Sequence, residues 1–263
     1  MDRKDFKYIY GPVASWRLGS SLGIDAISGK EKICTFDCVY CQLGRTGILS
    51  SQRRVFVPAD EIIRELVSLP FLKIDYITFS GSGEPTLAKN LGRIIKAIKK
   101  IRKVKIAVLT NASLIGRKDV REDLSLADFV AVKLDVSSQG LLEAVNQPVE
   151  SVRFERLLKA IMRFKADFKG RLALQIMFIK ENKKYARGIA RLARQIHPDE
   201  IHINTCLRPC GVRPLSRSEL RVVKNCFLHA CVKDTKILSV YECPEKEVKA
   251  ISKHATLKRR GKG

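Results

Sequence analysis

A repeated alternation of short apolar runs with amphipathic stretches constrains the fold of this chain more than any other feature of its sequence. Five runs rich in β-branched and aliphatic residues are predicted to be strands: 74–79, 105–110, 129–134, 172–179 and 200–204. Before and between them, apolar residues recur at helical spacing, which predicts helices at 60–69, 91–101, 117–126, 152–168 and 183–196. Strands separated by helices in this way form a parallel sheet with right-handed crossovers.

The segment from Phe6 to Ile27 adds to this series. Its short apolar runs are broken by glycines, which predicts two more strands joined by a tight turn. Counting the second of them gives six strand–helix units. We therefore expect an α/β fold, a partial (β/α)6 barrel of the TIM type, with functional residues at the carboxyl ends of its strands.

Three cysteines stand close together in the loop that should follow the first unit's strand. Cys34, Cys38 and Cys41 have C-x-x-x-C-x-x-C spacing, with Tyr40 directly before the last one. Thiolates this close can each terminate one iron of a [4Fe–4S] cluster, which leaves the fourth iron open to a small molecule. Zinc sites usually need a second cysteine pair, and a disulfide between such near neighbours would be strained and leave one cysteine over. The spacing favours an incomplete cluster site.

Beyond residue 204 the alternation stops. We expect a core of residues 1–204 and a small C-terminal α+β appendage of residues 205–263. Ser216 and Glu219 form a capping box that predicts a helix at 217–230. A strand at 236–241 and a short helix at 244–251 should follow. Residues 246–263 include seven basic side chains and one acidic, which predicts a mobile basic tail.

The appendage holds five more cysteines, the last of them Cys243. We expect no leader peptide, and therefore metal or redox use rather than a disulfide framework, although hyperthermophile proteins are an exception. Candidate ligands of a second iron–sulfur cluster or a zinc ion are Cys206, Cys210, Cys226 and Cys231. Alternatively, Cys226 and Cys231 pack in the core, since free cysteine behaves as a small hydrophobe.

Fifty Lys and Arg residues against 27 Asp and Glu residues give a formal net charge of +23. Thermophilic ion-pair networks enrich both signs together, so they do not explain an excess of one sign. A large positive field attracts polyanions, and nucleic acid is the natural candidate; the alternative is a solvated basic face. No apolar run is long enough to span a bilayer, so we expect a cytoplasmic protein with no membrane partner.

Several motifs together resemble a known family. They are Gly11 to Gly19 (GPVASWRLG), Ser21 to Ile24 (SLGI), the cysteine loop, Ser80 to Leu87, Val132 to Asp135 (VKLD) and Asn146-Gln147-Pro148. Over residues 8–214 the chain resembles the radical S-adenosylmethionine (SAM) superfamily, in the archaeal and bacterial group of iron–sulfur oxidoreductases usually classed with wyosine synthases. The substrate does not transfer, because the tRNA-wyosine enzyme differs around its own cysteines.

The resemblance implies a mechanism for the cysteine loop. Cys34, Cys38 and Cys41 would hold the [4Fe–4S] cluster, and SAM would chelate the open iron through its amino and carboxylate groups. One electron from the reduced cluster would cleave SAM, leaving a 5′-deoxyadenosyl radical that abstracts hydrogen from a substrate.

The same resemblance places SAM-binding residues. Tyr40 would line the adenine pocket. Ser82, Gly83 and Glu84 occupy the family's Gly-Gly-Glu position and would contact the SAM amino group, since a carboxylate suits an ammonium group.

Two further strand ends supply candidates. Asn111 and Lys133 would bind the ribose or the SAM carboxylate, and Asp135 is a weaker candidate. Asn and Asp also commonly end strands as turn residues, and that alternative stands for these positions.

We expect a radical SAM enzyme that modifies RNA, with tRNA as the leading substrate because of the charge. An electron donor such as ferredoxin or flavodoxin would be a partner. The alternatives are radical SAM modification of a protein or a small metabolite, and a non-catalytic RNA-binding protein stabilised by an iron–sulfur cluster or zinc. The Ser82-Gly83-Glu84 segment argues against the last, because a structural cluster needs no partner for an amino group.

Overall fold

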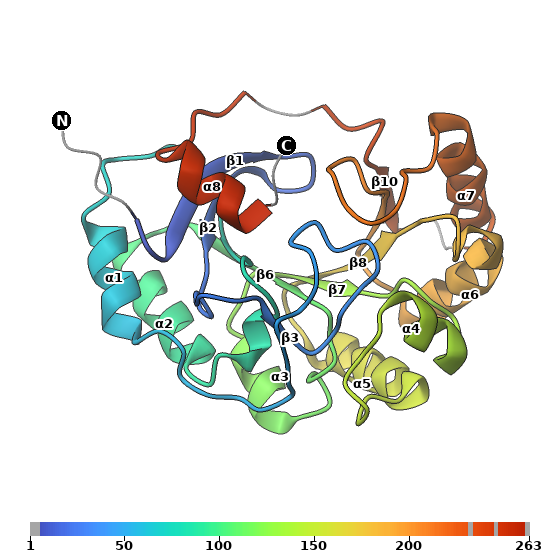
Figure 1. Ribbon diagram of the computed structural model, residues 1–263, viewed down its shortest axis with the longest axis horizontal. Helices are drawn as coiled ribbons and strands as arrows, with labels where there is room; N and C mark the ends of the chain where they lie inside the picture. Colours follow the sequence, from blue (N-terminus) through green and yellow to red (C-terminus); the bar gives the residue numbers. More distant parts are fainter. Residues whose placement is uncertain (1–5, 231–233, 245–246, 261–263) are drawn as a thin grey trace.

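The computed structural model describes residues 6–230, 234–244 and 247–260. Its centre is one eight-stranded sheet with strand order β1-β2-β5-β6-β7-β8-β9-β10, curled into half a barrel (Figure 1). The strands of this sheet are β1 (Ile9–Ser15), β2 (Gly19–Ile24), β5 (Tyr76–Phe79), β6 (Lys105–Thr110), β7 (Phe129–Lys133), β8 (Arg171–Met177), β9 (Glu200–Asn204) and β10 (Lys236–Ser239).

The six expected parallel strands are present as β2 and β5 to β9. Two edge strands extend the sheet. β1 pairs with β2 in the antiparallel direction, and β10 pairs with β9 in the parallel direction, with Ile237 opposite Ile201. The α/β class and the partial barrel are confirmed. The strand expected at 236–241 is present as β10, but it pairs within the main sheet and not within a separate appendage. The domain boundary expected at residue 204 stays a prediction.

Helices lie along the outer, convex side of the sheet (Figure 1). They are α1 (Ala59–Val67), α2 (Leu91–Ile101), α3 (Lys118–Leu124), α4 (Gln139–Val145), α5 (Phe154–Asp167), α6 (Ala186–Ile196) and α7 (Arg217–Ala230), with short 3-10 turns at Pro85–Leu87 and Lys183–Tyr185. The six helices expected before residue 231 are there, and α4 is an addition. None of the helices in the described ranges is long and apolar enough to cross a membrane.

Alternation of side chains along the strands separates the core from the barrel interior. In β6, Ile106 and Val108 belong to the large core beneath the helices. Ala107 points to the other face, where it packs with Ala131 and Ala173 of neighbouring strands. Leu18 and Phe129 pack in the same inner cluster, and Leu18 also lines the cavity described below.

The cysteine loop crosses the inside of the sheet (Figure 1). It runs between two very short parallel strands, β3 (Ile33–Cys34) and β4 (Ile48–Leu49). The loop is fixed to the rest of the chain by backbone hydrogen bonds, such as Val39 N to Val145 O at 3.1 Å.

The C-terminal segment differs from expectation. Residues 247–250 form no helix, so the helix expected at 244–251 is wrong there, and residues 245–246 lie outside the described ranges. Instead, α8 (Lys253–Arg260) packs against β1 (Figure 1). Ile251 N donates to Gly11 O at 2.6 Å where the chain reaches β1. The expectation of a mobile tail is therefore wrong over residues 253–260.

Candidate active site

One cavity of about 320 Å³ lies at the carboxyl ends of the strands. Its wall includes all three loop cysteines, together with Tyr40, Gly83, Glu84, Asn111 and Lys133. Of the nine residues expected to bind the cluster or SAM, eight therefore face one space. The exception is Ser82, whose hydroxyl donates to Asp25 Oδ2 at 2.6 Å and which is absent from the cavity wall as described.

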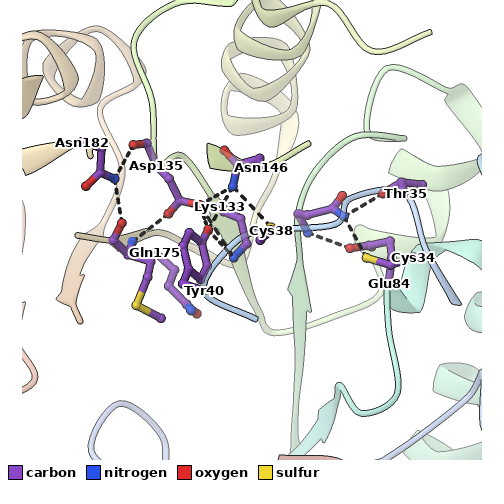
Figure 2. Close-up of polar contacts among 12 residues, drawn as sticks. Cys34, Thr35, Cys38, Tyr40, Glu84, Lys133, Asp135, Asn146, Gln175 and Asn182 are labelled. Carbon is purple, nitrogen blue, oxygen red and sulfur yellow. Dashed lines mark hydrogen bonds and ion pairs between the residues drawn. The ribbon is translucent and has the colours of Figure 1, made fainter. Parts of the chain in front are cut away.

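Side-chain amides donate to two of the cysteine sulfurs. Asn111 Nδ2 lies 3.6 Å from Cys34 Sγ, and Asn146 Nδ2 lies 3.4 Å from Cys38 Sγ (Figure 2). Hydrogen bonds to sulfur are one means by which proteins tune an iron–sulfur cluster. Burial raises the pKa of the Cys34 thiol to about 12 and also raises that of Cys38, so metal binding has to displace their protons.

The described residues contain no group of three Cys, His, Asp or Glu side chains arranged to hold a single metal ion. A tetrahedral zinc site would need such a group. A [4Fe–4S] cube does not, because each thiolate terminates a different iron. The three-cysteine loop has the thiolates that a [4Fe–4S] cluster with one open iron needs.

Glu84 is fixed at the cavity wall by donors of the protein. Its Oε1 accepts from the hydroxyls of Thr86 and Thr110, each at 2.6 Å, and its Oε2 accepts from Asn111 N at 2.7 Å. Burial raises the pKa of this carboxyl, while the hydrogen bonds from Asn111, Thr110 and Thr86 favour the ionised form. No ion pair of Glu84 is found within the described ranges. A buried carboxylate beside a cavity, with no cation of the protein against it, can bind an ammonium group of a ligand.

Gly83 serves a packing role that its place in the sequence motif does not reveal. Ile33 N donates to Ser82 O at 3.2 Å and Glu84 N donates to Ile33 O at 3.1 Å, so this segment pairs with the start of the cysteine loop. A Cβ atom on Gly83 would lie 1.7 Å from Ile33 O. Glycine is therefore required for the loop to approach the end of β5.

The hydroxyl of Tyr40 joins a buried polar network (Figure 2). It donates to Asp135 and accepts from Asn146 Nδ2 at 2.9 Å and Lys133 Nζ at 3.1 Å. Burial and the neighbouring Asp135 raise the pKa of Tyr40. Burial alone would lower the pKa of Lys133, but Asp135 and the loop cysteines raise it overall. A protonated lysine therefore stands next to the cysteines.

Asp135, the weaker candidate for SAM binding, is held inside the protein by hydrogen bonds. Its Oδ1 accepts from Met177 N at 2.7 Å, its carbonyl oxygen accepts from Asn182 Nδ2 at 2.9 Å, and its side chain is fully buried (Figure 2). It is not part of the cavity wall described above. It orients Tyr40 and Lys133 rather than facing a ligand.

The later cysteines do not form a complete metal site in the described ranges. Cys206 is buried next to Cys210 in the loop after β9, and burial and Cys210 together raise the pKa of Cys206. Cys226 lies on α7, where its Sγ donates to Val222 O at 3.6 Å. Cys231 lies outside the described residues. A second site remains a prediction.

Sequence reasoning missed several residues of the cavity and its surroundings. Asn146 contacts Cys38, Tyr40 and Asp135, although it follows a helix rather than a strand. Arg17 and Arg208 line the cavity from a hairpin turn and from the loop after β9. No strand-end pattern marks these positions; for Asn146 the only signal was its place in the Asn-Gln-Pro motif.

Comparisons with known proteins agree with this geometry. A family model described as "Radical SAM superfamily" matches residues 32–193. A UPF0026 protein of Synechocystis sp. is 44% identical over 81% of this chain and 79% of its own length. A UPF0026 protein of Methanocaldococcus jannaschii is 33% identical over 88% of this chain and 70% of its own.

Solved structures share the fold. The crystal structure of Streptococcus suis SuiB bound to S-adenosylmethionine aligns with a TM-score of 0.62 and 16% identity, over 80% of this chain and 48% of SuiB. Native anSMEcpe with bound AdoMet aligns with a TM-score of 0.59 and 17% identity, over 84% of this chain and 64% of that one. This chain thus spans about half of SuiB, and the likeness concerns the fold alone.

The chain belongs to the radical SAM superfamily, a class of enzymes whose members use a [4Fe–4S] cluster and SAM. Its sequence relatives above are UPF0026 proteins.

Proposed function

We propose that this enzyme binds a [4Fe–4S] cluster through Cys34, Cys38 and Cys41 and holds SAM against the open iron. The observation that carries the proposal is Glu84, a buried carboxylate on the same cavity wall as the three cysteines, held by donors but with no ion pair in the described ranges. With both groups bound, the site would supply a 5′-deoxyadenosyl radical that abstracts hydrogen from a substrate.

The remaining wall residues have roles that follow from their chemistry. Glu84 would accept hydrogen bonds from the SAM ammonium group. Lys133, protonated and close to the cysteines, would pair with the SAM carboxylate. The Tyr40 ring would pack on the adenine, with its hydroxyl already held by Asp135. Asn111 would bind the ribose, and the backbone of the Ser82-Gly83 segment would line the amino-group end.

The proposed substrate is RNA, with tRNA the first candidate. It is supported by the net charge of +23 and by a cavity wall that holds six basic side chains and a single acidic one. An electron donor such as ferredoxin or flavodoxin would reduce the cluster, and the cytoplasm is the proposed compartment.

The cofactor proposal is tested by anaerobic reconstitution, followed by addition of SAM and dithionite. 5′-Deoxyadenosine should appear. Glu84→Gln keeps the size of the side chain but removes the charge, so we expect SAM to bind at least about tenfold more weakly, in the range of a lost charge-assisted hydrogen bond. Glu122→Gln, on the exposed face of α3, is the matched control and should bind SAM like the wild type. No 5′-deoxyadenosine from a protein with an intact cluster would contradict the proposal.

The substrate proposal needs a separate test. Modified nucleosides of tRNA should be compared between cells with and without the gene. A nucleoside that disappears without the gene and returns with the wild-type gene supports RNA modification. An unchanged profile would instead favour a protein or small metabolite as the substrate.

A further inference from the structure

Six basic side chains line the cavity. Lys32 pairs with Asp37 at 3.8 Å, Lys133 with Asp135 at 3.7 Å and Arg259 with Asp25 at 3.1 Å. Arg17, Arg208 and Arg260 also line the cavity, and they come from the β1–β2 turn, the loop after β9 and α8. Segments far apart in the chain thus bring three guanidinium groups to one cavity.

Arg17 is the member of this group whose contacts are incomplete. Its Nη1 donates to the amide oxygen of Gln175, and its guanidinium group lies 5.1 Å from the centre of the Trp16 ring. Its Nε is buried and has no hydrogen-bond partner, and no ion pair of Arg17 is found within the described ranges. Burial, together with the positive charges of Arg208 and Arg260, lowers the pKa of Arg17 to about 10.

The position of Arg17 is unfavourable until an anion enters it. A buried donor without a partner costs roughly 1–3 kcal/mol, and like charges held together repel. An oxyanion between the guanidinium groups would relieve both costs. Arginine is well suited to this task, because its planar fork can bind phosphate or carboxylate through two parallel hydrogen bonds.

Arg208 connects this group to the cysteine loop, and none of the three arginines is among the expected SAM contacts. Arg208 Nη1 donates to Gln42 Oε1 at 3.1 Å, and Gln42 directly follows Cys41. The same Nη1 donates to Arg260 O at 3.0 Å, which joins the loop after β9 to α8. Lys133 is the cation close to the cysteines, whereas the charges that act on Arg17 are those of Arg208 and Arg260.

We propose that Arg17, with Arg208 and Arg260, forms a subsite for an anionic oxo group of the substrate, a phosphate or a carboxylate, in the wall of the cavity. The subsite rests on the proposed function, because the anion belongs to the molecule that loses hydrogen there. By holding that group next to Gln42, it places the rest of the substrate over the cysteine loop. Gln175 positions Arg17 through its amide oxygen.

The test measures binding of simple ions to the reconstituted, cluster-loaded full-length protein. Equilibrium dialysis with radiolabelled orthophosphate and, separately, with radiolabelled acetate is carried out at constant ionic strength. Wild type should bind one ion per chain, and Arg17→Met should bind it at least tenfold more weakly. Arg17→Lys should fall between them. Arg93→Met, an exposed arginine on α2, is the matched control and should bind like wild type.

Tryptophan fluorescence provides a second readout of ion binding. Trp16 is its only tryptophan and lies against Arg17, so its fluorescence should change as the ion binds. If Arg17→Met does not fold, Arg208→Gln in the surface loop replaces it, again with an expected loss of at least tenfold. Preference for orthophosphate identifies a phosphate-bearing substrate, and preference for acetate a carboxylate.

Three results would overturn the subsite: no binding of either ion by wild type, equal binding by wild type and by the Arg17 and Arg208 variants, or an equal loss of SAM affinity in Arg17→Met. The last would show that Arg17 serves the cofactor. Dialysis needs no turnover, so the subsite can be detected even if no 5′-deoxyadenosine forms, and it can fail while SAM cleavage succeeds.

Discussion

Because Gly83 has no side chain, the cysteine loop can approach the sheet closely. The backbone of Gly83 lies directly against the carbonyl group of Ile33, and hydrogen bonds on both sides of Gly83 hold the start of the loop at the end of β5. The sequence motif predicts glycine here for contact with SAM. The packing supplies a second reason, which applies before any cofactor binds.

Gly83→Ala should therefore destabilise the protein and loosen the loop. We expect a loss of roughly 2–4 kcal/mol in the free energy of unfolding, since the new Cβ would lie 1.7 Å from Ile33 O. Thermal unfolding and iron content after reconstitution would measure both effects. Gly116→Ala, whose new Cβ would meet nothing closer than Ala160 at 3.8 Å, should stay within about 1 kcal/mol of wild type. Equal stability of the two variants would contradict the packing role.

A buried histidine inside the half-barrel makes stability depend on pH. His202 stacks on Phe129, and its Nε2 lies 2.8 Å from Glu200 Oε2, while its Nδ1 is buried without a partner. Burial lowers the pKa of His202 below its usual 6.5, and Arg17 adds to this, whereas Glu200 opposes it. As the pH falls through about 6.5, His202 therefore becomes protonated in the unfolded chain while it stays neutral in the folded chain.

The contribution of neutral His202 to the free energy of unfolding is therefore complete above pH 6.5. It is lost as the pH falls from there through the lower pKa of the folded state. Between pH 7.5 and 5.5 the midpoint of thermal unfolding should fall for wild type and fall less for His202→Gln. His254→Gln, exposed on α8, should keep the wild-type slope. The same slope in His202→Gln as in wild type would exclude this histidine as the cause.

At the scale of elements, α8 is the part that sequence periodicity misplaced. Half of its eight residues are Lys or Arg, with little of the apolar pattern that marks the outer helices. What anchors it is a buried ion pair: Arg259 Nε lies 3.1 Å from Asp25 Oδ2, and Thr256 Oγ1 accepts from Gly11 N at 3.1 Å. Residues 253–260, which the sequence alone predicts to be a mobile basic tail, form a helix because their partners, Asp25 and Gly11, lie near the other end of the chain.

Arg259→Ala should release this helix and leave Asp25 buried without its cation. Removal of one partner of a buried ion pair costs about 3–5 kcal/mol. Proteolysis within residues 247–260 should speed up as well, which limited digestion can measure. Arg93→Ala breaks an exposed pair with Asp60 and should cost less than about 1 kcal/mol. Unchanged protease resistance in Arg259→Ala would show that α8 is held by other contacts.

At the scale of the whole molecule, the metal content separates one cluster from two. Wild type reconstituted with iron and sulfide should contain about four irons per chain if the loop holds the only cluster. The combined change of Cys34, Cys38 and Cys41 to alanine should then reduce iron and zinc to near zero by elemental analysis. Metal retained by this variant would instead assign a second site to the later cysteines.

The repeating pattern of the sequence was sufficient to predict the partial barrel, its six central strands and the outer helices other than α4, because periodicity and strand-ending residues are local properties of the chain. Cysteine spacing was likewise sufficient to predict a cluster site, since three thiolates within eight residues share one loop whatever the rest of the chain does.

Only the tertiary structure decided which distant residues meet at the cavity. Arg17 bonds to Gln175 across 158 positions, and Arg259 bonds to Asp25 across 234 positions. Contacts over such separations depend on how the sheet curls and how its edges are covered, and no local period encodes them. The proposed cluster loop could thus be predicted from the sequence, whereas the proposed arginine subsite depends on contacts that form only in the folded chain.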